Sequence, residues 1–372
     1  MGPGPAALSL LPELERALSN QAALLPVPAD DPRQSALLTQ TLRAGAPIDD
    51  AIAAVVSTSG STGRPKGAML TAAALTAGAH ATHARLGGPG HWLLALPAYH
   101  IAGLQVLIRS VCAGTTAAAL SPGFDGAEFS SAVAALGPGR RYTSLVAVQL
   151  AKALADPVAT AALAELDAVL IGGGPMPAGL NESAAAAGIF VVRTYGMSET
   201  AGGCVYDGVP LDGVQLRIGD DGRIALGGPT VAAGYRNPVS PSPFCDGWFT
   251  TDDLGVVDDS GSLRVLGRVD DAIATGGLKV LPTLVESALA GHPTIAECAV
   301  FGLPDQRLGQ RVVAALVLRP GAGAPSVAEL RTHIALTLPA TAAPRELHVL
   351  AELPRLGIGK IDRKALVARF GD

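Results

Sequence analysis

Hydrophobic and polar positions divide the chain into three stretches with different periodicity. From about residue 50 to 200, short apolar runs alternate with Ala-rich segments. The runs predict strands at 51–58, 91–97, 143–150, 166–174 and 189–196. The Ala-rich segments predict helices at 71–86, 126–136 and 177–187. This strand–helix alternation indicates an α/β layered domain with a largely parallel sheet, preceded by an amphipathic stretch at 8–24.

The pattern changes after residue 212. Short alternating runs at 213–228 and 254–268 are each interrupted by an Asp/Gly turn, which is typical of hairpins and predicts a small antiparallel sheet or barrel. Beyond residue 271, the pattern predicts a helix after Pro282, strands at 297–303 and 311–321, a helix at 326–338 and a strand at 345–350. We expect a compact α+β domain there.

Composition excludes several classes of protein. With 372 residues, 49% hydrophobic and 16% charged, the chain is globular and large enough for two or three domains. A net charge of -5 with no basic run argues against nucleic-acid binding. The four cysteines form no C-x-x-C pair and lie near no histidine cluster, so free thiols in a cytoplasmic protein are expected. His80 and His83 are interpreted as surface or packing residues.

The most apolar window, 101–120, has Arg109 at its middle. A charge at the centre of a bilayer is costly, so we interpret this window as a buried core segment and expect no membrane span. The N-terminus has no cationic start and is a poor secretory signal.

The segment VSTSGSTGRPKGAML, residues 56–70, is the first candidate for chemistry. Its glycines allow close backbone approach, its hydroxyls donate hydrogen bonds, and Arg64 and Lys66 add positive charge, which together suit a polyphosphate. A helical pattern begins near Thr71, and we expect its N-terminal dipole to reach this loop. Lys66 is followed by Gly67, so the segment is not a Walker A loop.

This segment resembles the phosphate-loop signature of the adenylate-forming superfamily, which includes acyl-CoA synthetases, nonribosomal peptide adenylation domains and luciferases. Six further segments resemble that family's motifs in the family's order: LPAYHIAG (96–103), GGGP (172–175), YGMSE (195–199), GWFTTDDLG (247–255), GRVDDAIATGG (267–277) and PRLGIGKIDRKAL (354–366). Together the motifs cover residues 56–366.

The resemblance implies a large N-terminal α/β AMP-binding domain, residues 1–269, with a small β-barrel-like part. A small mobile α+β domain, residues 270–372, would carry the catalytic lysine and swing about a hinge near Asp270. It also implies that ATP activates a carboxylic acid as an acyl-adenylate, with Mg²⁺ on the phosphates, before the acyl group passes to coenzyme A.

The resemblance also implies roles for individual residues. The residues expected to bind phosphate are Ser57, Thr58, Ser59, Gly60, Ser61, Thr62, Gly63 and Lys66. Those expected around adenine and ribose are Gly172, Gly173, Gly174, Tyr195, Gly196, Ser198, Asp253 and Arg268. Glu199 and Thr58 would hold the metal, and Gly276 and Gly277 would face coenzyme A. Asp252 stands where the family usually has Gly, and Lys279 where many relatives have Asn.

Lys360, Glu199 and His100 are the expected catalytic residues. The Lys360 ammonium would lie between the α-phosphate and the attacking carboxylate, two anions that repel each other. A fixed cation at such a position contributes about 3–4 kcal/mol to transition-state stabilisation.

The acid is expected to contact His100, Gly103 and Arg109. An arginine in an apolar setting requires an anionic partner, which is either a structural aspartate or a second carboxylate on the substrate. The His-x-x-Gly-x-Gln pattern before this arginine, and SLVAVQL at 144–150, are similar to the o-succinylbenzoate–CoA ligases of menaquinone biosynthesis, whose substrate is a dicarboxylate. The chain is also as short as some members of that group. Its reduced N-terminal region would need compensation, for instance from a partner subunit, and a homodimer is compatible with this.

Three alternatives remain open at this stage. The chain could be another aryl- or acyl-CoA ligase with the same chemistry, an adenylation domain serving a carrier protein, or an inactive binding protein. The retained loop, Glu199, Asp253 and Lys360 favour an enzyme.

Overall fold

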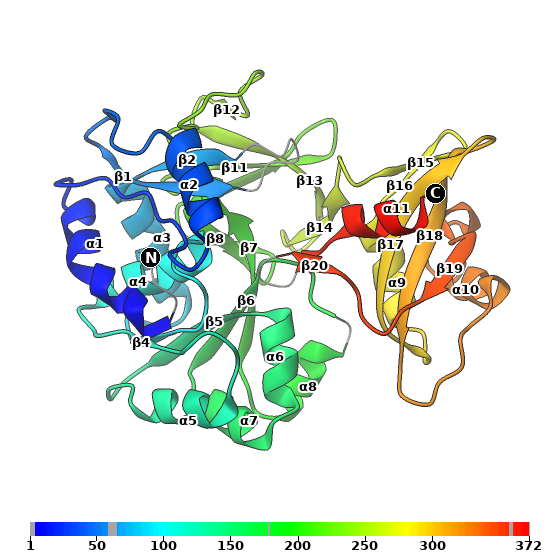
Figure 1. The fold of residues 1–372 in the computed structure, drawn as a ribbon, viewed down its shortest axis with the longest axis horizontal. Coiled ribbons are helices and arrows are strands. Elements are labelled where there is room, and N and C mark those ends of the chain that lie inside the picture. Colours follow the sequence, from blue (N-terminus) through cyan, green and yellow to red (C-terminus); the bar gives the residue numbers. More distant parts are fainter. Residues whose placement is uncertain (1–3, 59–64, 178, 357–359, 372) are drawn as a thin grey trace. The chain divides into compact units, whose positions relative to one another are not determined.

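A computed structural model describes residues 4–58, 65–177, 179–356 and 360–371, with the side chains of Leu356 and Lys360 outside the description. The chain forms two compact units. The first comprises Met1–Gly172, Asn181–Thr251 and Val257–Leu263, and the second comprises Gly173–Leu180, Asp252–Val256 and Arg264–Asp372. Figure 1 labels their elements.

A seven-stranded sheet forms the centre of the first unit. Its order is β4 (Ala118–Ala119), β3 (His91–Leu94), β5 (Arg141–Val146), β6 (Ala168–Gly172), β7 (Val191–Met197), β8 (Gly202–Tyr206) and β9 (Val209–Pro210). The first five strands run parallel, β8 pairs antiparallel with β7, and β9 pairs antiparallel with β8. The predicted α/β domain with a largely parallel sheet is confirmed.

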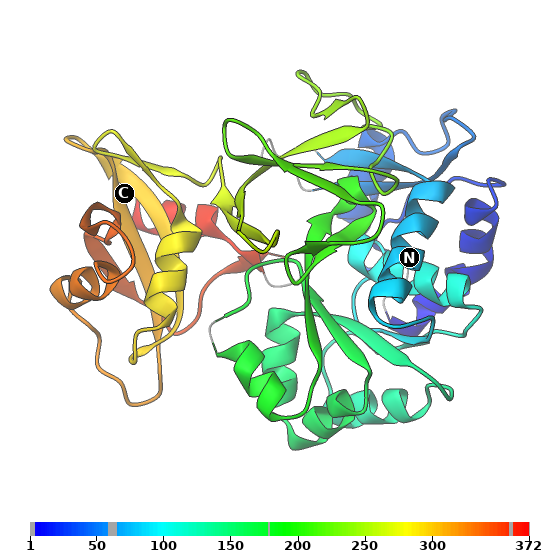
Figure 2. The same ribbon diagram turned by 180° about the vertical axis from the view of Figure 1, so that it is seen from behind.

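Helices lie on both sides of this sheet (Figures 1 and 2). One group consists of η1 (Gly4–Leu10), α1 (Leu11–Leu18), α3 (Ala72–Arg85) and α4 (Ile101–Ala113). The other consists of α5 (Gly126–Ala134), α6 (Ala147–Leu154), α7 (Pro157–Ala164) and α8 (Leu180–Ala186). The predicted strand at 143–150 is therefore half wrong, because Gln149 accepts from the Val146 amide and caps the start of α6.

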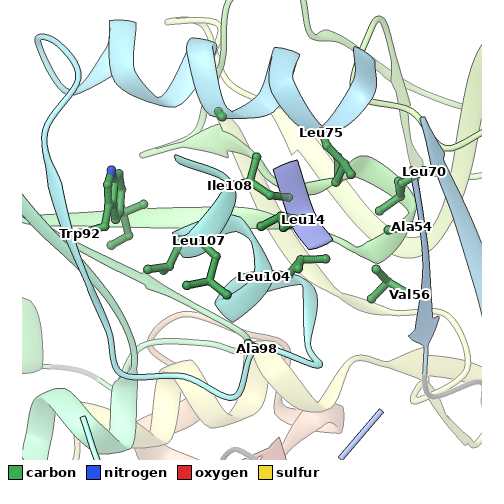
Figure 3. Packing of buried hydrophobic residues seen from close by; sticks show 14 of the residues in the cluster. Leu14, Ala54, Val56, Leu70, Leu75, Trp92, Ala98, Leu104, Leu107 and Ile108 are labelled. Atoms are coloured by element: carbon green, nitrogen blue, oxygen red, sulfur yellow. The ribbon is translucent and has the colours of Figure 1, made fainter. Parts of the chain in front are cut away.

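Helix α4 supplies much of the core of this unit. Its residues Leu104, Leu107 and Ile108 pack with Leu14 of α1 and Leu75 of α3 (Figure 3). Each is almost fully buried, which stabilises the fold by about 1.5–3 kcal/mol per side chain. The expectation that this apolar window is a buried core segment is confirmed. Across the described residues, no helix is both long and apolar enough to cross a membrane.

Strands β1 (Ile52–Thr58) and β2 (Lys66–Thr71) form a separate antiparallel pair. The predicted helix begins only after β2, at Ala72, where Thr71 caps α3 by accepting from the Ala74 amide. Five extended residue steps place this helix end about 17 Å along the chain from Lys66. The expected contribution of the helix dipole to the loop was therefore wrong, because a strand intervenes.

Both edges of the β1–β2 pair are covered by the chain itself. Leu24 pairs with β1 through hydrogen bonds to Ala53 and Val55, and residues 233–236 pair with β2. Helix α2 (Pro32–Thr41) packs nearby through Leu38. Leu24 of the N-terminal region thus covers the β1 edge, and residues 233–236 cover the β2 edge.

A five-stranded sheet follows in the order β10 (Gln215–Ile218), β11 (Arg223–Gly227), β13 (Trp248–Val257), β12 (Phe244–Cys245), with β14 (Leu263–Arg268) also paired to β13. The hairpin predicted at 213–228 is confirmed by the antiparallel β10–β11 pair.

The second unit is built on another five-stranded sheet. Its order is β16 (Leu278–Val280), β15 (Ile273–Thr275), β18 (Gly309–Leu318) and β17 (Ile295–Asp305), with β19 (Glu346–Val349) parallel to β18. Alternate residues of β17 and β18 face opposite sides. One face is covered by α9 (Pro282–Ala290) and α10 (Val327–Ile334), and the other by α11 (Arg363–Phe370). A short turn, η3 (Ala340–Ala342), and the strands β20 (Arg355–Leu356) and β21 (Lys360–Ile361) complete this α+β unit, as the sequence predicts.

Candidate functional site

The predicted phosphate loop joins β1 to β2. Thr58 and Lys66 are opposite each other in the antiparallel register, so the two ends of the loop meet. Ser57, Thr58 and Lys66 are half-buried. Ser59, Gly60, Ser61, Thr62 and Gly63 lie outside the described residues.

Glu199 lies close to the end of β1. It occupies the short turn η2 (Ser198–Thr200), which follows β7 directly. Ser198 Oγ donates to the Ser57 carbonyl at 3.5 Å, so this turn touches the strand that leads into the loop. The Glu199 side chain is buried, and its Oε1 accepts a 2.7 Å hydrogen bond from Tyr235 Oη. Strand ends and turns at this edge of an α/β sheet are common ligand-binding positions.

Two glycine positions allow backbones to approach closely beside this turn. A Cβ at Gly196 would collide with the Gly202 carbonyl of the neighbouring strand, and a Cβ at Gly172 would collide with Thr194 Oγ1. Tyr195, next to Gly196, is half-buried on β7. Gly173 and Gly174 belong to the second unit and are described with it.

His100 precedes α4, and its half-buried ring lies 4.5 Å from the Tyr99 ring, centroid to centroid. Burial lowers the pKa of His100, which favours a neutral imidazole at neutral pH. Gly103 is buried in the first turn of α4, where a Cβ would collide with the Pro97 carbonyl. The structure therefore gives Gly103 a packing reason that is independent of any substrate.

Arg109 occupies a different place from the one the sequence suggests. Its guanidinium carbon lies 4.8 Å from the Trp92 ring centroid, and Nη2 donates to Tyr206 Oη at 3.2 Å. The side chain is 4% exposed, and among the described residues no acidic group pairs with it. Burial lowers its pKa, partly offset by Tyr206.

This geometry answers one of the two alternatives that the sequence left open for Arg109. Among the described residues its partners in the core are an aromatic face and a hydroxyl, and not a structural aspartate. Arg109 is also eight helical residues beyond Ile101, about 12 Å along α4 from the end that carries His100. This distance argues against a contact between Arg109 and the substrate, which stays a prediction that Arg109→Met tests.

In the second unit, Arg268 holds three carboxylates together. It pairs with Asp270 at 2.9 Å, Asp253 at 3.3 Å and Asp252 at 3.6 Å. Burial alone would lower the Arg268 pKa, but the hydrogen bonds and charge of Asp270, followed by the other two aspartates, raise it overall. The Asp253 side chain is 14% exposed and that of Asp252 48%, so Asp253 is the more enclosed of the two.

The remaining predicted residues also lie in this unit. Gly276 and Gly277 form the two-residue turn between β15 and β16, with φ of +57° and +80°, as a type I′ hairpin requires. Gly173, with φ of +83°, and Gly174 begin the segment Gly173–Leu180. Lys360 lies on β21, opposite Leu356 of β20; its side chain lies outside the described residues.

The comparisons with known proteins agree with this architecture. A family described as "AMP-binding enzyme" matches residues 10–236, and one described as "AMP-binding enzyme C-terminal domain" matches residues 284–360. The chain belongs to the AMP-binding enzyme family. As in the sequence-based prediction, a large α/β region is followed by a smaller C-terminal region.

Similar proteins within this AMP-binding family are named for one particular ligase activity. The chain is 64% identical to a "Probable 2-succinylbenzoate--CoA ligase" of Mycobacterium tuberculosis, over 99% of this chain and 96% of the relative. It is 34% identical to the 2-succinylbenzoate–CoA ligase of Bacillus licheniformis, over 86% of this chain and 70% of the relative.

Solved structures of the family are also similar. The o-succinylbenzoate CoA synthetase (MenE) of Bacillus subtilis, in complex with the acyl-adenylate intermediate OSB-AMP, is 32% identical with a TM-score of 0.73, over 85% of this chain and 69% of that chain. ATP-bound MatB of Rhodopseudomonas palustris is 28% identical with a TM-score of 0.77, over 88% and 69%.

Sequence reasoning missed two buried groups in this AMP-binding enzyme. Tyr235 bonds Glu199, and Gln105 Nε2 on α4 donates to the Ala201 carbonyl at 2.7 Å, directly after the Glu199 turn. Ala201 has φ of +52°, so this turn is held in a conformation that an alanine rarely adopts. Tyr235 follows Gly234 in the sequence, and nothing local marks the tyrosine as a partner of Glu199.

Proposed function

We propose that this protein is an ATP-dependent 2-succinylbenzoate–CoA ligase of menaquinone biosynthesis. The observation that carries the proposal is the 64% identity, over 96% of its length, to a relative named for that activity. The site geometry supports it, because the loop strands β1 and β2 and the Glu199 turn lie together in one unit.

The proposed reaction has two steps. A carboxylate oxygen of 2-succinylbenzoate attacks the α-phosphorus of ATP, the bond to the pyrophosphate oxygen breaks, and acyl-adenylate and pyrophosphate form. The thiolate of coenzyme A then attacks the acyl carbon, AMP leaves, and the thioester remains. The neutral His100 ring, whose pKa is lowered by burial, would lie beside the acid without adding charge.

The residues present fit the Mg²⁺ that this chemistry requires. Glu199 offers a buried carboxylate, and among the described residues only Oε1 of that group accepts a hydrogen bond. The structure shows no cluster of three or more metal-binding side chains in its described part. Proteins typically bind Mg²⁺ through one or two carboxylates together with substrate phosphates, and Glu199 supplies one such carboxylate. When bound, Mg²⁺ neutralises phosphate charge; Glu199 and the Thr58 hydroxyl would hold it.

Residues of the second unit complete the proposal. Asp253 and Arg268 would bind the ribose hydroxyls, Gly276 and Gly277 would face coenzyme A, and Lys360 would stabilise the crowded anions of the adenylation step. Residues 270–372 would act as the mobile domain, with a hinge at Asp270. The bidentate contact between Arg268 and Asp270 would lie at this hinge.

Pyrophosphate release with a panel of acids tests the substrate. We expect 2-succinylbenzoate to exceed benzoates and fatty acids by at least about 100-fold in kcat/KM, as expected when a second charged group is recognised. A preference for a monocarboxylic acid would favour another aryl- or acyl-CoA ligase. Absence of ATP–pyrophosphate exchange with every acid would refute the proposal.

The proposal extends to location and assembly. ATP and coenzyme A are cytoplasmic substrates, and all four cysteines are free, with burial raising the pKa of Cys204 and Cys298 to about 12. We place the enzyme in the cytoplasm and expect a homodimer, which light scattering after size-exclusion chromatography checks.

A further inference from the structure

One segment of the first unit connects the loop strand β2 with the Glu199 turn. Residues 232–237 run beside β2, where Met69 donates to the Gly234 carbonyl at 2.9 Å and Arg236 donates to the Gly67 carbonyl at 2.7 Å. The amide of Ala232 donates to the carbonyl of Glu199 at 2.9 Å. The segment therefore fixes the backbone on both sides of the proposed metal and phosphate site.

Tyr235 is the side chain of this segment that faces the site. Its hydroxyl donates to Glu199 Oε1 at 2.7 Å, and its ring centroid lies 5.3 Å from Lys66 Nζ. The Phe244 ring packs against it edge-on at 5.1 Å. The side chain is 9% exposed, so these contacts form in a largely dry environment. One tyrosine thus contacts both the proposed metal carboxylate and the cation that ends the phosphate loop.

We propose that Tyr235 is a positioning residue that sets the orientation of the Glu199 carboxylate toward Mg²⁺ and of Lys66 toward phosphate. The inference rests on the proposed function, and it assigns a role to a residue outside the motifs that identify the family in this chain. The hydroxyl occupies Oε1, which fixes the rotation of the carboxylate and determines where Oε2 points. The ring provides a face on which the Lys66 ammonium can lie.

The segment is anchored well enough for this role. Arg236 is 8% exposed and donates to four carbonyls at the end of α2 and after it, including those of Pro47 at 2.8 Å and Ala46 at 2.9 Å. Asn237 donates to the Pro65 carbonyl at 2.7 Å and accepts from the Gly67 amide at 3.1 Å. Because both neighbours of Tyr235, Gly234 and Arg236, are hydrogen-bonded to β2, Tyr235 cannot follow a Glu199 side chain that turns away.

Two substitutions separate the two contacts. Tyr235→Phe removes the hydroxyl but keeps the ring beneath Lys66, whereas Tyr235→Leu removes both. Tyr206→Phe is the matched control, because it removes another buried tyrosine hydroxyl from the same unit, one bonded to Thr82 and Arg109. Thermal unfolding by circular dichroism verifies that each variant is folded.

The primary measurement is Mn²⁺ binding in the presence of ATP, followed by electron paramagnetic resonance, because it does not depend on turnover. We expect Tyr235→Phe to raise the half-saturating Mn²⁺ concentration roughly tenfold, as the loss of a hydrogen bond to a charged group implies. AMP affinity in EDTA should stay within about twofold of wild type. Tyr235→Leu should weaken ATP binding further, and Tyr206→Phe should change neither quantity.

The double variant Glu199→Gln/Tyr235→Phe adds an independent check. If Tyr235 acts through Glu199, the double variant binds Mn²⁺ no more weakly than Glu199→Gln alone. The inference is overturned if Tyr235→Phe and wild type bind Mn²⁺ equally well. It is also overturned if Tyr235→Phe loses as much affinity for AMP without metal as it loses for Mn²⁺. If the wild-type protein binds Mn²⁺ and ATP normally but exchanges no pyrophosphate with any acid, the proposed function is overturned, while the Mn²⁺ affinities of Tyr235→Phe and wild type still test the inference. If the wild-type protein binds no ATP, both are overturned.

Discussion

A contact made by Arg363, within the lysine motif 354–366, predicts how the second unit responds to mutation. Arg363, three residues after Lys360, begins α11 and donates to both oxygens of Glu286 on α9, at 2.6 and 2.8 Å. Its Nε donates to the Val300 carbonyl at 3.1 Å, and Asp271 lies 3.5 Å from Nη1. Arg363→Ala removes all of these contacts and leaves Glu286 with the Val300 amide as its described hydrogen-bond donor.

The loss of stability expected for Arg363→Ala follows from the burial of the Arg363–Glu286 ion pair. Breaking a buried ion pair by removing one partner costs about 3–5 kcal/mol. The side chains are 20% and 10% exposed, so solvent screening places this pair at the lower end, about 3 kcal/mol. For a domain of roughly 100 residues, about 1 kcal/mol shifts Tm by at least 4 °C, so we expect a decrease of roughly 10 °C or more.

Thermal unfolding combined with hydrogen exchange of the residues of α9 and α11 measures this loss in the full-length protein. The matched control is Arg369→Ala on the same helix, an exposed arginine whose guanidinium contacts the Phe370 ring at 5.2 Å, for which we expect a change of less than about 1 kcal/mol. Replacing both partners, as in Arg363→Met/Glu286→Met, should cost less than Arg363→Ala, because no charge is left buried. A Tm for Arg363→Ala equal to that of Arg369→Ala would refute the reasoning.

Three further predictions concern other groups. Burial, followed by the charges of Arg109 and His80, lowers the pKa of His83 from 6.5 to about 4. Between these two pH values the unfolded state binds a proton that the folded state does not bind. The free energy of unfolding should therefore be at its full value above pH 6.5 and fall by up to roughly 3 kcal/mol toward pH 4. His83→Gln, which keeps an acceptor for Trp92 Nε1, should flatten that dependence in urea unfolding, and an unchanged slope would contradict it. Arg109→Met should leave KM for 2-succinylbenzoate within about twofold, whereas a rise of about 100-fold, the size of a lost charged hydrogen bond, would restore the substrate contact. Lys360→Ala should abolish adenylate formation in pyrophosphate exchange but leave thioester formation from supplied acyl-adenylate, and equal loss of both steps would remove its proposed role.

Most of the secondary structure could be predicted from the sequence because it depends on short-range periodicity. The alternation along β17 and β18 separates two apolar faces, and strands were predicted there from the sequence. The prediction failed where a side-chain hydrogen bond determined the backbone conformation. Gln149 caps α6 inside an apolar run that reads as strand, since periodicity over four residues cannot distinguish the two.

Local patterns in the chain were enough to establish the family, the order of the motifs and the two classes of domain, because each depends on residues close together in the chain. The pairing of groups that are far apart in the chain became visible only in the folded structure. It surrounded Arg109 with Trp92 and Tyr206, and it brought Tyr235 to Glu199 across 36 positions. The physical reason is that many hydroxyls and aromatic rings along the chain could satisfy a buried charge equally well. Packing of the helices and sheets selects the one that is within hydrogen-bond distance.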